Sequence, residues 1–400
     1  MTAEQKTVLA LLNSAITNTP AEIDADCDWS AVIAEARQQA VLFMIFDVLS
    51  KTEGVPSEIV NECFQKSCAY LANNAKMGHL QKHLTKVLTR ENIPYVILKG
   101  EAAASFYDKP ELRLLGDVDF LIPAEMIDAA GEVLVNAGYS KYLEGHICHK
   151  VYRRGDCLAE MHFALSGMPR NEKYSRMVED FIKNIFTDAV QKDIGSGEFL
   201  CPSDKHNAVV FLLHMQHHMK GEGLGLRHLC DWIYFVNKTG SEPFWQDELI
   251  PFLEEINLFR FTKTFTKMCS MYLPFPCPDW AADADENVAA ELFIEILDGG
   301  NFGRKDELRV ASKKMVSNRG DGKNKGKLHN LYENLKCSVY EKHPILKKAP
   351  VLYPALLVYR TARYALMMAT GERVPLYKSL VQANKRIALY EKLSIFEEEK

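Results

Sequence analysis

The sequence lacks the features of a disulfide scaffold and of a membrane protein. Its ten cysteines are scattered and form no CxxC pair, so they indicate reduced thiols in a reducing compartment. The richest apolar segment, residues 351–370, is interrupted by Pro354, Arg360 and Arg363, and a membrane-spanning helix is therefore not expected. The N-terminal segment carries Glu4 ahead of its short apolar stretch and lacks a basic region, so it is a poor secretory signal.

An excess of positive charge is also missing. The 400 residues include 48 Lys and Arg against 53 Asp and Glu, which gives a net charge of −5. Overall attraction to nucleic acid or to an anionic membrane is therefore not expected. With 47% hydrophobic and 25% charged residues, the composition is typical of a globular protein. These properties together predict a cytoplasmic protein.

The periodicity of apolar residues predicts three regions. Residues 1–91 are rich in Ala, Leu, Gln, Glu and Lys and form a helical N-terminal region. Residues 92–165 are typical of a small α/β core, and residues 166–400 of a large helical C-terminal region. In the last region helices are predicted near 171–187, 204–220, 226–238, 244–272, 285–298, 327–342 and 349–369, with a loose loop at 317–327.

The central region predicts a small mixed sheet. Its first strand follows Pro94 and leads directly into Lys99 and Gly100, which indicates a buried strand and a tight turn. Gly138 is a suitable C-cap for the helix that follows the second strand. The expected fold class is therefore α+β. Strands are predicted at 95–98, 117–122, 140–143, 148–153 and 157–163, and helices at 101–107 and 124–136.

Two aspartates of the second strand carry the clearest chemical signal. Asp117 and Asp119 are two residues apart, so on a strand their carboxylates project from the same face. Two such charges repel each other unless a cation lies between them, and Mg²⁺ binds oxygen ligands of this kind together with substrate phosphates. Glu160 is the candidate third ligand if its strand lies beside the strand that carries the two aspartates. The pattern predicts phosphoryl or nucleotidyl transfer with Mg²⁺ or Mn²⁺.

The order of these motifs resembles the polymerase-beta-like nucleotidyltransferase superfamily, and most closely its bacterial branch of uncharacterised nucleotidyltransferase-like proteins. The resemblance rests on LKG at 98–100, DVDFLI at 117–122 and EMHF at 160–163. It implies that Asp117, Asp119 and Glu160 bind the metal ions. It also implies that Gly100 lies in the turn that holds the nucleotide phosphates.

The same resemblance assigns further residues to nucleotide binding. Lys99, Arg113 and His162 are similar to residues of the branch, and Arg227 with Asp231 is similar to its arginine and aspartate pair on a helix. The resemblance implies in-line attack by an acceptor hydroxyl on the α-phosphate of a nucleoside triphosphate such as ATP, with release of pyrophosphate. Glu160 would then hold a second metal or act as the general base.

Simple ion pairs are the alternative for several of these residues. Lys99 and Arg113 would each be a surface charge or would pair with Asp117 or Glu101 in place of a phosphate. Arg227 and Asp231 have the i, i+4 spacing of a salt bridge within one helix.

Other functions also stay open. A member of the superfamily that has lost its activity would keep the fold as a binding module, and Glu101 favours this because it adds negative charge where phosphates should lie. A metallohydrolase would use His214 and His218, which have the i, i+4 spacing of metal ligands. A second cluster has irregular spacing for a zinc motif and consists of His146, Cys148, His149 and Cys157.

The expected partners are a nucleoside triphosphate and an acceptor of unknown identity. The acidic net charge favours a small molecule or a protein over nucleic acid as the acceptor. No membrane partner is expected.

Overall fold

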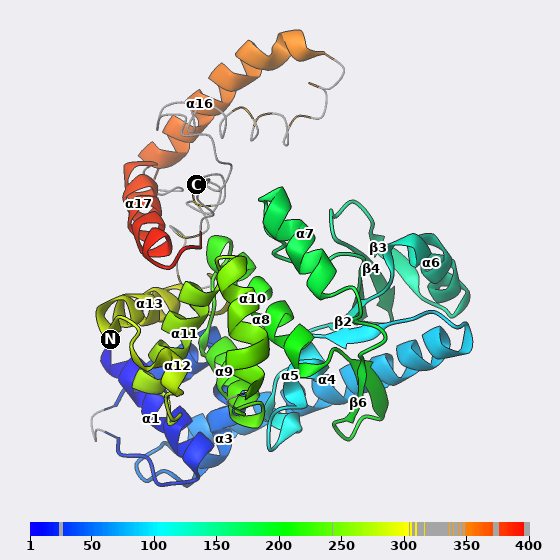
Figure 1. Ribbon diagram of the computed structural model, residues 1–400. Coiled ribbons are helices and arrows are strands. Elements are labelled where there is room, and N and C mark those ends of the chain that lie inside the picture. Colours follow the sequence, from blue (N-terminus) through cyan, green and yellow to red (C-terminus); the bar gives the residue numbers. More distant parts are fainter. Residues whose placement is uncertain are drawn as a thin grey trace.

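The computed structural model confirms an α+β fold in which helices surround a small mixed sheet (Figure 1). The structure describes residues 1–23, 27–241, 243–303, 349–370 and 376–395, with single positions between 304 and 348. Within these residues no helix is both long and apolar enough to cross a membrane. The predicted loop at 317–327 lies outside the described part, as does most of the predicted helix at 327–342.

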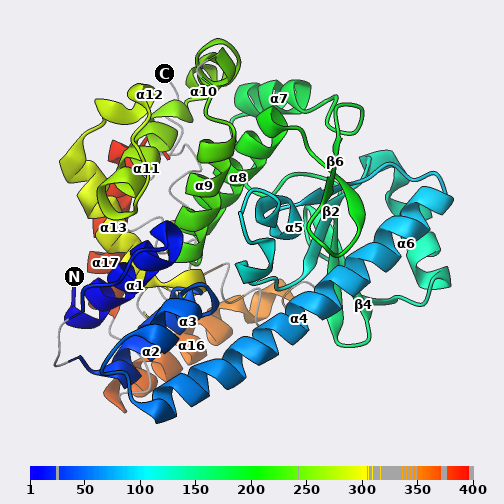
Figure 2. The ribbon, with the colours of Figure 1, turned by 90° about the horizontal axis from the view of Figure 1, so that it is seen from below.

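Four helices form the N-terminal region, and local sequence explains where they begin. Thr2 and Gln5 form a capping box at the first helix, and the Asp28 side chain accepts the Ala31 backbone N–H at the second. The fourth helix, 34 residues long, extends from this region to the sheet (Figure 2). The helices are α1 (Ala3–Thr17), α2 (Trp29–Gln38), α3 (Leu42–Lys51) and α4 (Ser57–Arg90).

The central sheet has five strands in the order β1-β2-β5-β4-β3. β2 and β5 are parallel, whereas the other neighbouring strands are antiparallel. All the predicted strands are confirmed, with ends that differ by one residue at most. They are β1 (Val96–Leu98), β2 (Val118–Leu121), β3 (Ser140–Leu143), β4 (His149–Arg154) and β5 (Cys157–His162).

The helices of the central region are shorter than predicted. The first, α5, spans Gly100–Ala104 and is followed by a 3₁₀ turn, η1, at Pro110–Leu112. The second begins as a 3₁₀ turn, η2, at Ala124–Met126 and continues as α6, Ile127–Asn136. Gly138 has a φ of +89° and ends α6, because its N–H bonds the Val135 carbonyl and the next N–H bonds the Leu134 carbonyl.

A small second sheet was not predicted. β6 (Val190–Asp193) and β7 (Glu198–Cys201) form an antiparallel hairpin, and β7 lies against β1. The turn between them is built by Asp193, whose Oδ1 accepts the backbone N–H groups of Gly195 and Gly197 at 2.7 and 3.1 Å. Both glycines have positive φ. The hairpin is short and lies between two helices, α7 (Glu172–Phe181) and α8 (Asp204–Lys220). The helical periodicity of these neighbours therefore predicts a helical region and not a hairpin.

Helices account for most of the C-terminal region. The predicted helix at 244–272 is in fact interrupted, because Asn257 has a φ of +58° and the Leu258 N–H turns back to the Leu253 carbonyl. The elements are α7 (Glu172–Phe181), α8 (Asp204–Lys220), α9 (Leu226–Lys238), the π-helical η3 (Phe244–Leu249), α10 (Ile250–Glu255), α11 (Phe259–Tyr272), α12 (Asp279–Ala282), α13 (Glu286–Gly299), η4 (Asn301–Gly303), η7 (Pro350–Leu352), α16 (Tyr353–Ala369) and α17 (Leu376–Lys392).

The two faces of the sheet pack into different hydrophobic cores. On β1, Val96 and Leu98 belong to a core shared with the N-terminal helices and with α8 and α9. Ile97, between them, belongs to a second core formed with α4 and α6. In β2, Phe120 faces this second core, so Asp119 projects from the opposite face, toward α8 and α9. The alternation of a single strand therefore aims the acidic residue at the C-terminal helices.

Candidate active site

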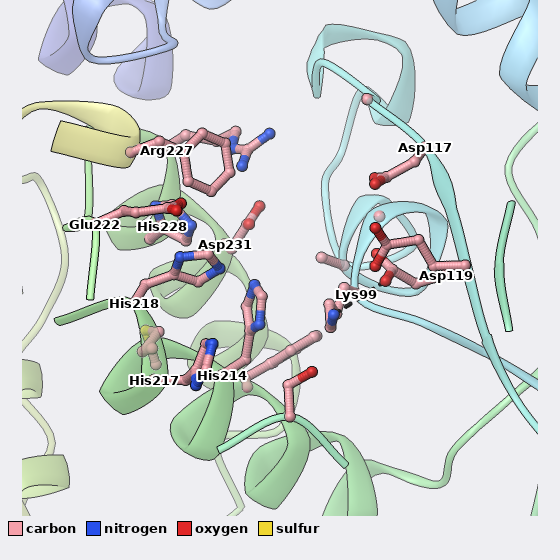
Figure 3. A pocket seen from close by; sticks show the side chains of 18 of the residues that line it. Lys99, Asp117, Asp119, His214, His217, His218, Glu222, Arg227, His228 and Asp231 are labelled. Carbon is pink, nitrogen blue, oxygen red and sulfur yellow. Dashed lines mark hydrogen bonds and ion pairs between the residues drawn. The ribbon is translucent and has the colours of Figure 1, made fainter. Parts of the chain in front are cut away.

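A cavity of about 540 Å³ lies between the sheet and the helices α8 and α9 (Figure 3). One wall carries the predicted acids and Lys99, and the opposite wall carries Arg227 and several histidines. The residues that line the cavity include Lys99, Gly100, Arg113, Asp117, Asp119, His146, His149, Glu160, His214, His218, Arg227, His228, Asp231 and Phe302.

Strand pairing puts two of the three predicted acids side by side, and the third lines the same cavity. β2 and β5 are adjacent, and Asp119 lies directly opposite Glu160 in their parallel register. Asp117 immediately precedes β2 and lines the same cavity. The predicted adjacency of the strand that carries Glu160 is therefore confirmed, and it depends on a pairing that joins residues 41 positions apart.

The charged form of Asp117 is destabilised by its surroundings. Burial raises the pKa of Asp117, and the charges of Asp119 and Glu160 raise it further, to about 7. The ionised form of Asp117 is therefore disfavoured at neutral pH. A divalent cation beside the carboxylates would stabilise the ionised form, and hard oxygen ligands suit Mg²⁺ or Mn²⁺. The carboxylate donors thus fit the predicted metal in their chemistry, but the three do not form a group whose ligand atoms all lie within 4.8 Å of one another.

Lys99 is directed at an acid of this site. Its Nζ donates to Asp119 Oδ1 at 3.0 Å, and both side chains are largely buried. Burial lowers the pKa of Lys99, but Asp119 more than compensates and raises it above the usual value. The backbone of Lys99 has a φ of 50° and a ψ of −102°, which is a strained conformation for any residue other than glycine. The sequence alternative was an ion pair with Asp117 or Glu101, but the observed partner is Asp119. A contact between Lys99 and phosphate stays a prediction.

His162 is the second partner of Asp119. Its Nε2 lies 2.8 Å from Asp119 Oδ1 and 3.5 Å from Glu160 Oε2, and its side chain is buried. Burial lowers the pKa of His162, but hydrogen bonding to the acids reverses this and raises it to about 10. For Asp119, burial raises the pKa, but Lys99 and His162 lower it below its usual range. Both partners bind Oδ1, which leaves Oδ2 as the oxygen for an ion.

Gly100 lies where the resemblance puts the phosphate turn, at the start of α5 in the cavity wall. Glu101, next to it, is fully buried and does not line the cavity. Burial raises the pKa of Glu101 to about 8, so this carboxyl is largely protonated at neutral pH. The expected negative charge at the turn is therefore largely absent, because the side chain is directed into the protein.

Arg113 is bound to α9 through Asp231. Its Nε donates to Asp231 Oδ1 at 2.8 Å and its Nη2 to Oδ2 at 2.9 Å. Tyr107 donates its hydroxyl to the same carboxylate at 2.7 Å. Asp231 therefore pairs with Arg113, and the expected salt bridge between Arg227 and Asp231 within α9 is wrong for the described residues. The guanidinium of Arg113 is engaged by this pair, so a role in phosphate binding stays a prediction.

Arg227 reaches the cavity from α9. Its Nη1 donates to the Leu114 carbonyl at 3.4 Å, and its Cζ lies 5.7 Å from the centre of the Phe302 ring. Its Nε is buried and has no hydrogen-bond partner among the residues described. In Figure 3 the side chain lies in the wall opposite Asp117 and Asp119. Arg227 thus has donor capacity available to a ligand.

The histidines beside Arg227 are uncharged. Burial lowers the pKa of His214, His218 and His228 well below the usual value. The Gly225 backbone N–H donates to His228 Nδ1 at 3.2 Å, so the proton is on Nε2, which has no partner in the described part of the chain. These three histidines therefore offer neutral hydrogen-bonding groups beside Arg227. Sequence reasoning missed His228, because only its contact with α8 in the fold brings it beside His214 and His218.

The histidine pair of the alternative hydrolase hypothesis lies in the cavity wall. The rings of His214 and His218 are close, with centres 4.3 Å apart. The groups of three or more potential metal ligands that the described residues form include neither of these histidines, and they include neither Asp117 nor Asp119. Both groups contain His149 instead, one with His146 and Cys148 and the other with Glu160 and His162.

Comparison with known proteins agrees with the geometry. A family described as "Uncharacterised nucleotidyltransferase" matches residues 25–274, more than half of the chain. The match includes the central sheet, the three acids, α8 and α9. No curated protein matches the sequence.

Proposed function

Because the chain belongs to the uncharacterised nucleotidyltransferase family, we propose that it transfers a nucleoside monophosphate from a nucleoside triphosphate to a hydroxyl acceptor. Family membership supports nucleotidyl transfer as the general reaction. The observation that carries the proposal is the convergence of Asp117, Asp119 and Glu160 on one cavity, beside the Gly100 turn.

Asp117 and Asp119 would hold Mg²⁺ or Mn²⁺, and Glu160 would hold a second metal ion or act as the general base. When bound, the ion would neutralise the triphosphate and stabilise the charge that develops on its oxygens. Lys99 and His162 orient Asp119 through its Oδ1, which keeps the other oxygen available. The backbone at Gly100 lines the cavity with no side chain to obstruct a phosphate.

Glu160 is suited to receive the proton of the acceptor. Its side chain is 23% exposed, compared with 8% for Asp119, so it is more accessible to a substrate. The acceptor oxygen attacks the α-phosphorus, and the bond from this phosphorus to the oxygen bridging to the β-phosphate breaks. Pyrophosphate leaves, and the hydroxyl proton passes to Glu160.

The opposite wall is the proposed place for contacts that distinguish substrates. Arg227 has donors for a phosphate or a base. The neutral His228 offers a hydrogen bond to a polar group of the acceptor. The cavity volume of about 540 Å³ is in the range for small-molecule sites. A small-molecule acceptor is therefore favoured, with a protein side chain as the next candidate.

An inactive binding module is the second candidate function. Its main support in the sequence was the charge of Glu101, and the burial of that carboxyl weakens the argument. Retention of the three acids in one cavity also argues against it. The nucleotide experiment below distinguishes the two.

The experiment is a thermal-shift and calorimetric titration with ATP, GTP, CTP and UTP, each with Mg²⁺ or Mn²⁺. One nucleotide should stabilise the protein only when the metal is present, by about 2.7 kcal/mol at a hundredfold excess over its Kd. The double variant Asp117→Asn, Asp119→Asn should lose this ligand-induced shift. Without ligand, Asp117→Asn relieves the repulsion that raises the Asp117 pKa, whereas Asp119→Asn removes the charged partner of the buried Lys99 and His162. Each protein is therefore compared with its own ligand-free unfolding temperature.

A matched control removes the same charge outside the cavity. Glu125 and Glu132 are exposed acids of the same region, and Glu125→Gln, Glu132→Gln should keep the full nucleotide shift. If no triphosphate stabilises the unmodified protein with either metal, the transferase proposal fails and the binding module takes its place.

A further inference from the structure

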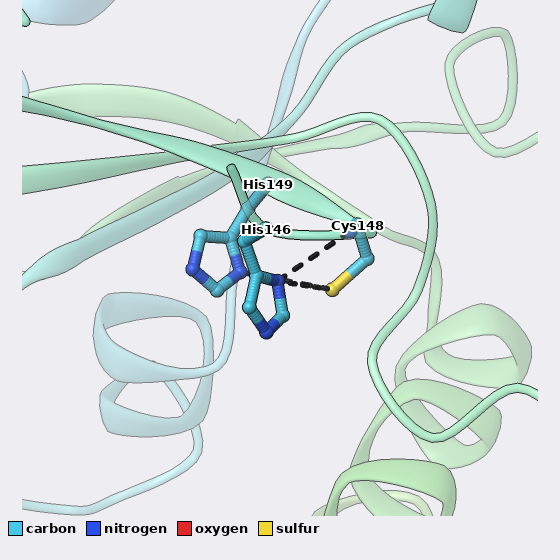
Figure 4. A group of neighbouring side chains, drawn as sticks. All are labelled: His146, Cys148 and His149. Atoms are coloured by element: carbon cyan, nitrogen blue, oxygen red, sulfur yellow. Dashed lines mark hydrogen bonds between the residues drawn. The ribbon is translucent and has the colours of Figure 1, made fainter. Parts of the chain in front are cut away.

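A cysteine and two histidines form a compact group at the rim of the cavity, where the chain enters β4 (Figure 4). Cys148 Sγ lies 3.3 Å from His146 Nδ1 and 3.7 Å from His149 Nδ1. The two imidazole rings are stacked, with centres 3.8 Å apart. The ligand atoms of the three side chains all lie within 4.8 Å of one another.

These separations match those of a tetrahedral zinc centre. With Zn–S near 2.3 Å and Zn–N near 2.05 Å, tetrahedral angles separate sulfur and nitrogen by about 3.6 Å. The two observed distances lie on either side of this value. The Cys148 backbone N–H donates to His146 Nδ1 at 3.4 Å, so this nitrogen is unprotonated, and a metal ion would take the place of that long hydrogen bond.

We propose that His146, Cys148 and His149 bind a transition-metal ion of the Zn²⁺ class. Thiolate and imidazole ligands select zinc over magnesium, whereas the carboxylates of Asp117, Asp119 and Glu160 have the opposite preference. The cavity would therefore hold two chemically different ion sites side by side. Cys157 does not belong to the cluster, because in the β4–β5 ladder it pairs with Arg154, at the opposite end from His149.

The fourth position of the ion would face the cavity. His146 and His149 both line it, and His149 Nδ1 lies 3.9 Å from Glu160 Oε2. Three protein ligands with an open position are typical of zinc sites that bind substrate, whereas structural sites have four protein ligands. If the proposed transferase function holds, this position lies beside the proposed general base and would bind an oxygen or sulfur of the acceptor.

Metal binding is tested on the full chain, purified without a metal-binding tag. Elemental analysis should find about one equivalent of zinc after equilibration with Zn²⁺. Substitution with Co²⁺ should give the charge-transfer absorption of a thiolate–cobalt bond. Asp117→Asn, Asp119→Asn should keep this zinc and its cobalt spectrum, so that failure of the Mg²⁺ and nucleotide site is distinguishable from failure of the zinc site.

Variants identify the ligands. Cys148→Ser should abolish the cobalt charge-transfer band, and His146→Asn should weaken Zn²⁺ binding by about tenfold or more. His146 is exposed, so the second variant tests the site even if the buried Cys148→Ser does not fold. Cys157→Ser, in the same strand pair, should change neither readout. Absence of stoichiometric Zn²⁺ binding, or binding that His146→Asn leaves unchanged, would overturn the proposal.

Discussion

Glu101 shows how burial changes the chemistry of a single residue. Both of its carboxylate oxygens are buried and have no hydrogen-bond partner within the described residues. Arg113 lowers its pKa, but burial has the larger effect and raises it to about 8. A carboxyl group that is neutral in the folded state and charged in the unfolded state makes stability depend on pH.

We expect Glu101→Gln to stabilise the protein increasingly with pH. Between pH 4.5 and 8 the folded protein retains a proton at Glu101 that the unfolded chain has lost, so its stability falls as pH rises. Glutamine does not ionise. The variant should raise the free energy of unfolding by about 1–3 kcal/mol at pH 8 and by less than about 1 kcal/mol at pH 5.

Urea unfolding at both pH values measures this difference. Glu111→Gln is the control, because Glu111 is exposed and close in sequence, and its effect should not change with pH. A Glu101→Gln effect that is equally large at pH 5 and pH 8 would contradict a raised pKa.

At the scale of elements, a glycine sets the distance between the end of the sheet and α8. Gly167 follows β5 and has a φ of +85°. A Cβ added there would collide with the backbone of Leu213 in α8 and would lie 3.1 Å from His217 Cβ. Since His214 and His218 line the cavity from α8, this close approach determines the width of the site.

Gly167→Ala should destabilise the protein by about 2–5 kcal/mol, because left-handed backbone strain and overpacking against α8 add together. Gly155→Ala separates the two effects. Gly155 has a φ of +60° and no atom within 4 Å of an added Cβ, so its cost should be only about 1–2 kcal/mol. Denaturant unfolding compares them, and equal costs would show that α8 is free to move away.

For the whole molecule, the pair of Arg113 and Asp231 connects the α/β core to α9. Their side chains are 6% and 13% exposed. Lys238 and Asp108 join the same two parts at 2.8 Å, but their side chains are 53% and 75% exposed. The two ion pairs connect the same two parts and differ mainly in burial. Burial determines how much each pair contributes to the free energy of unfolding.

Arg113→Met should therefore lower the free energy of unfolding by about 3–5 kcal/mol, since it leaves the largely buried Asp231 carboxylate with Tyr107 as its remaining partner. Lys238→Ala should cost within about 0.5 kcal/mol. The double variant Arg113→Met, Asp231→Asn should cost at least about 1 kcal/mol less than the sum of the single changes. Chemical denaturation of the unmodified protein, Arg113→Met, Asp231→Asn, the double variant and Lys238→Ala measures these changes. Equal effects of Arg113→Met and Lys238→Ala would disprove the connecting role.

The strands and most helices could be predicted because their signals are local. The run from residue 95 to 98 is apolar and precedes a glycine turn, and the ends of α8 and α9 agree with the predicted ones. The hairpin of β6 and β7 and the break at Asn257 could not be predicted, because a backbone turn overrides the average periodicity of its neighbours. The domain boundaries stay predictions, since α1–α3 share a core with the C-terminal helices.

The sequence by itself determined the α+β class, the central strands and the acidic pair, because alternation along a strand is enough to put Asp117 and Asp119 on one face. Only the tertiary structure decided the partners. It brought Glu160 beside Asp119, paired Arg113 with Asp231, buried Glu101 and set His228 opposite the acids. These contacts join residues distant in the chain, and burial then sets their charge, so no local pattern contains them.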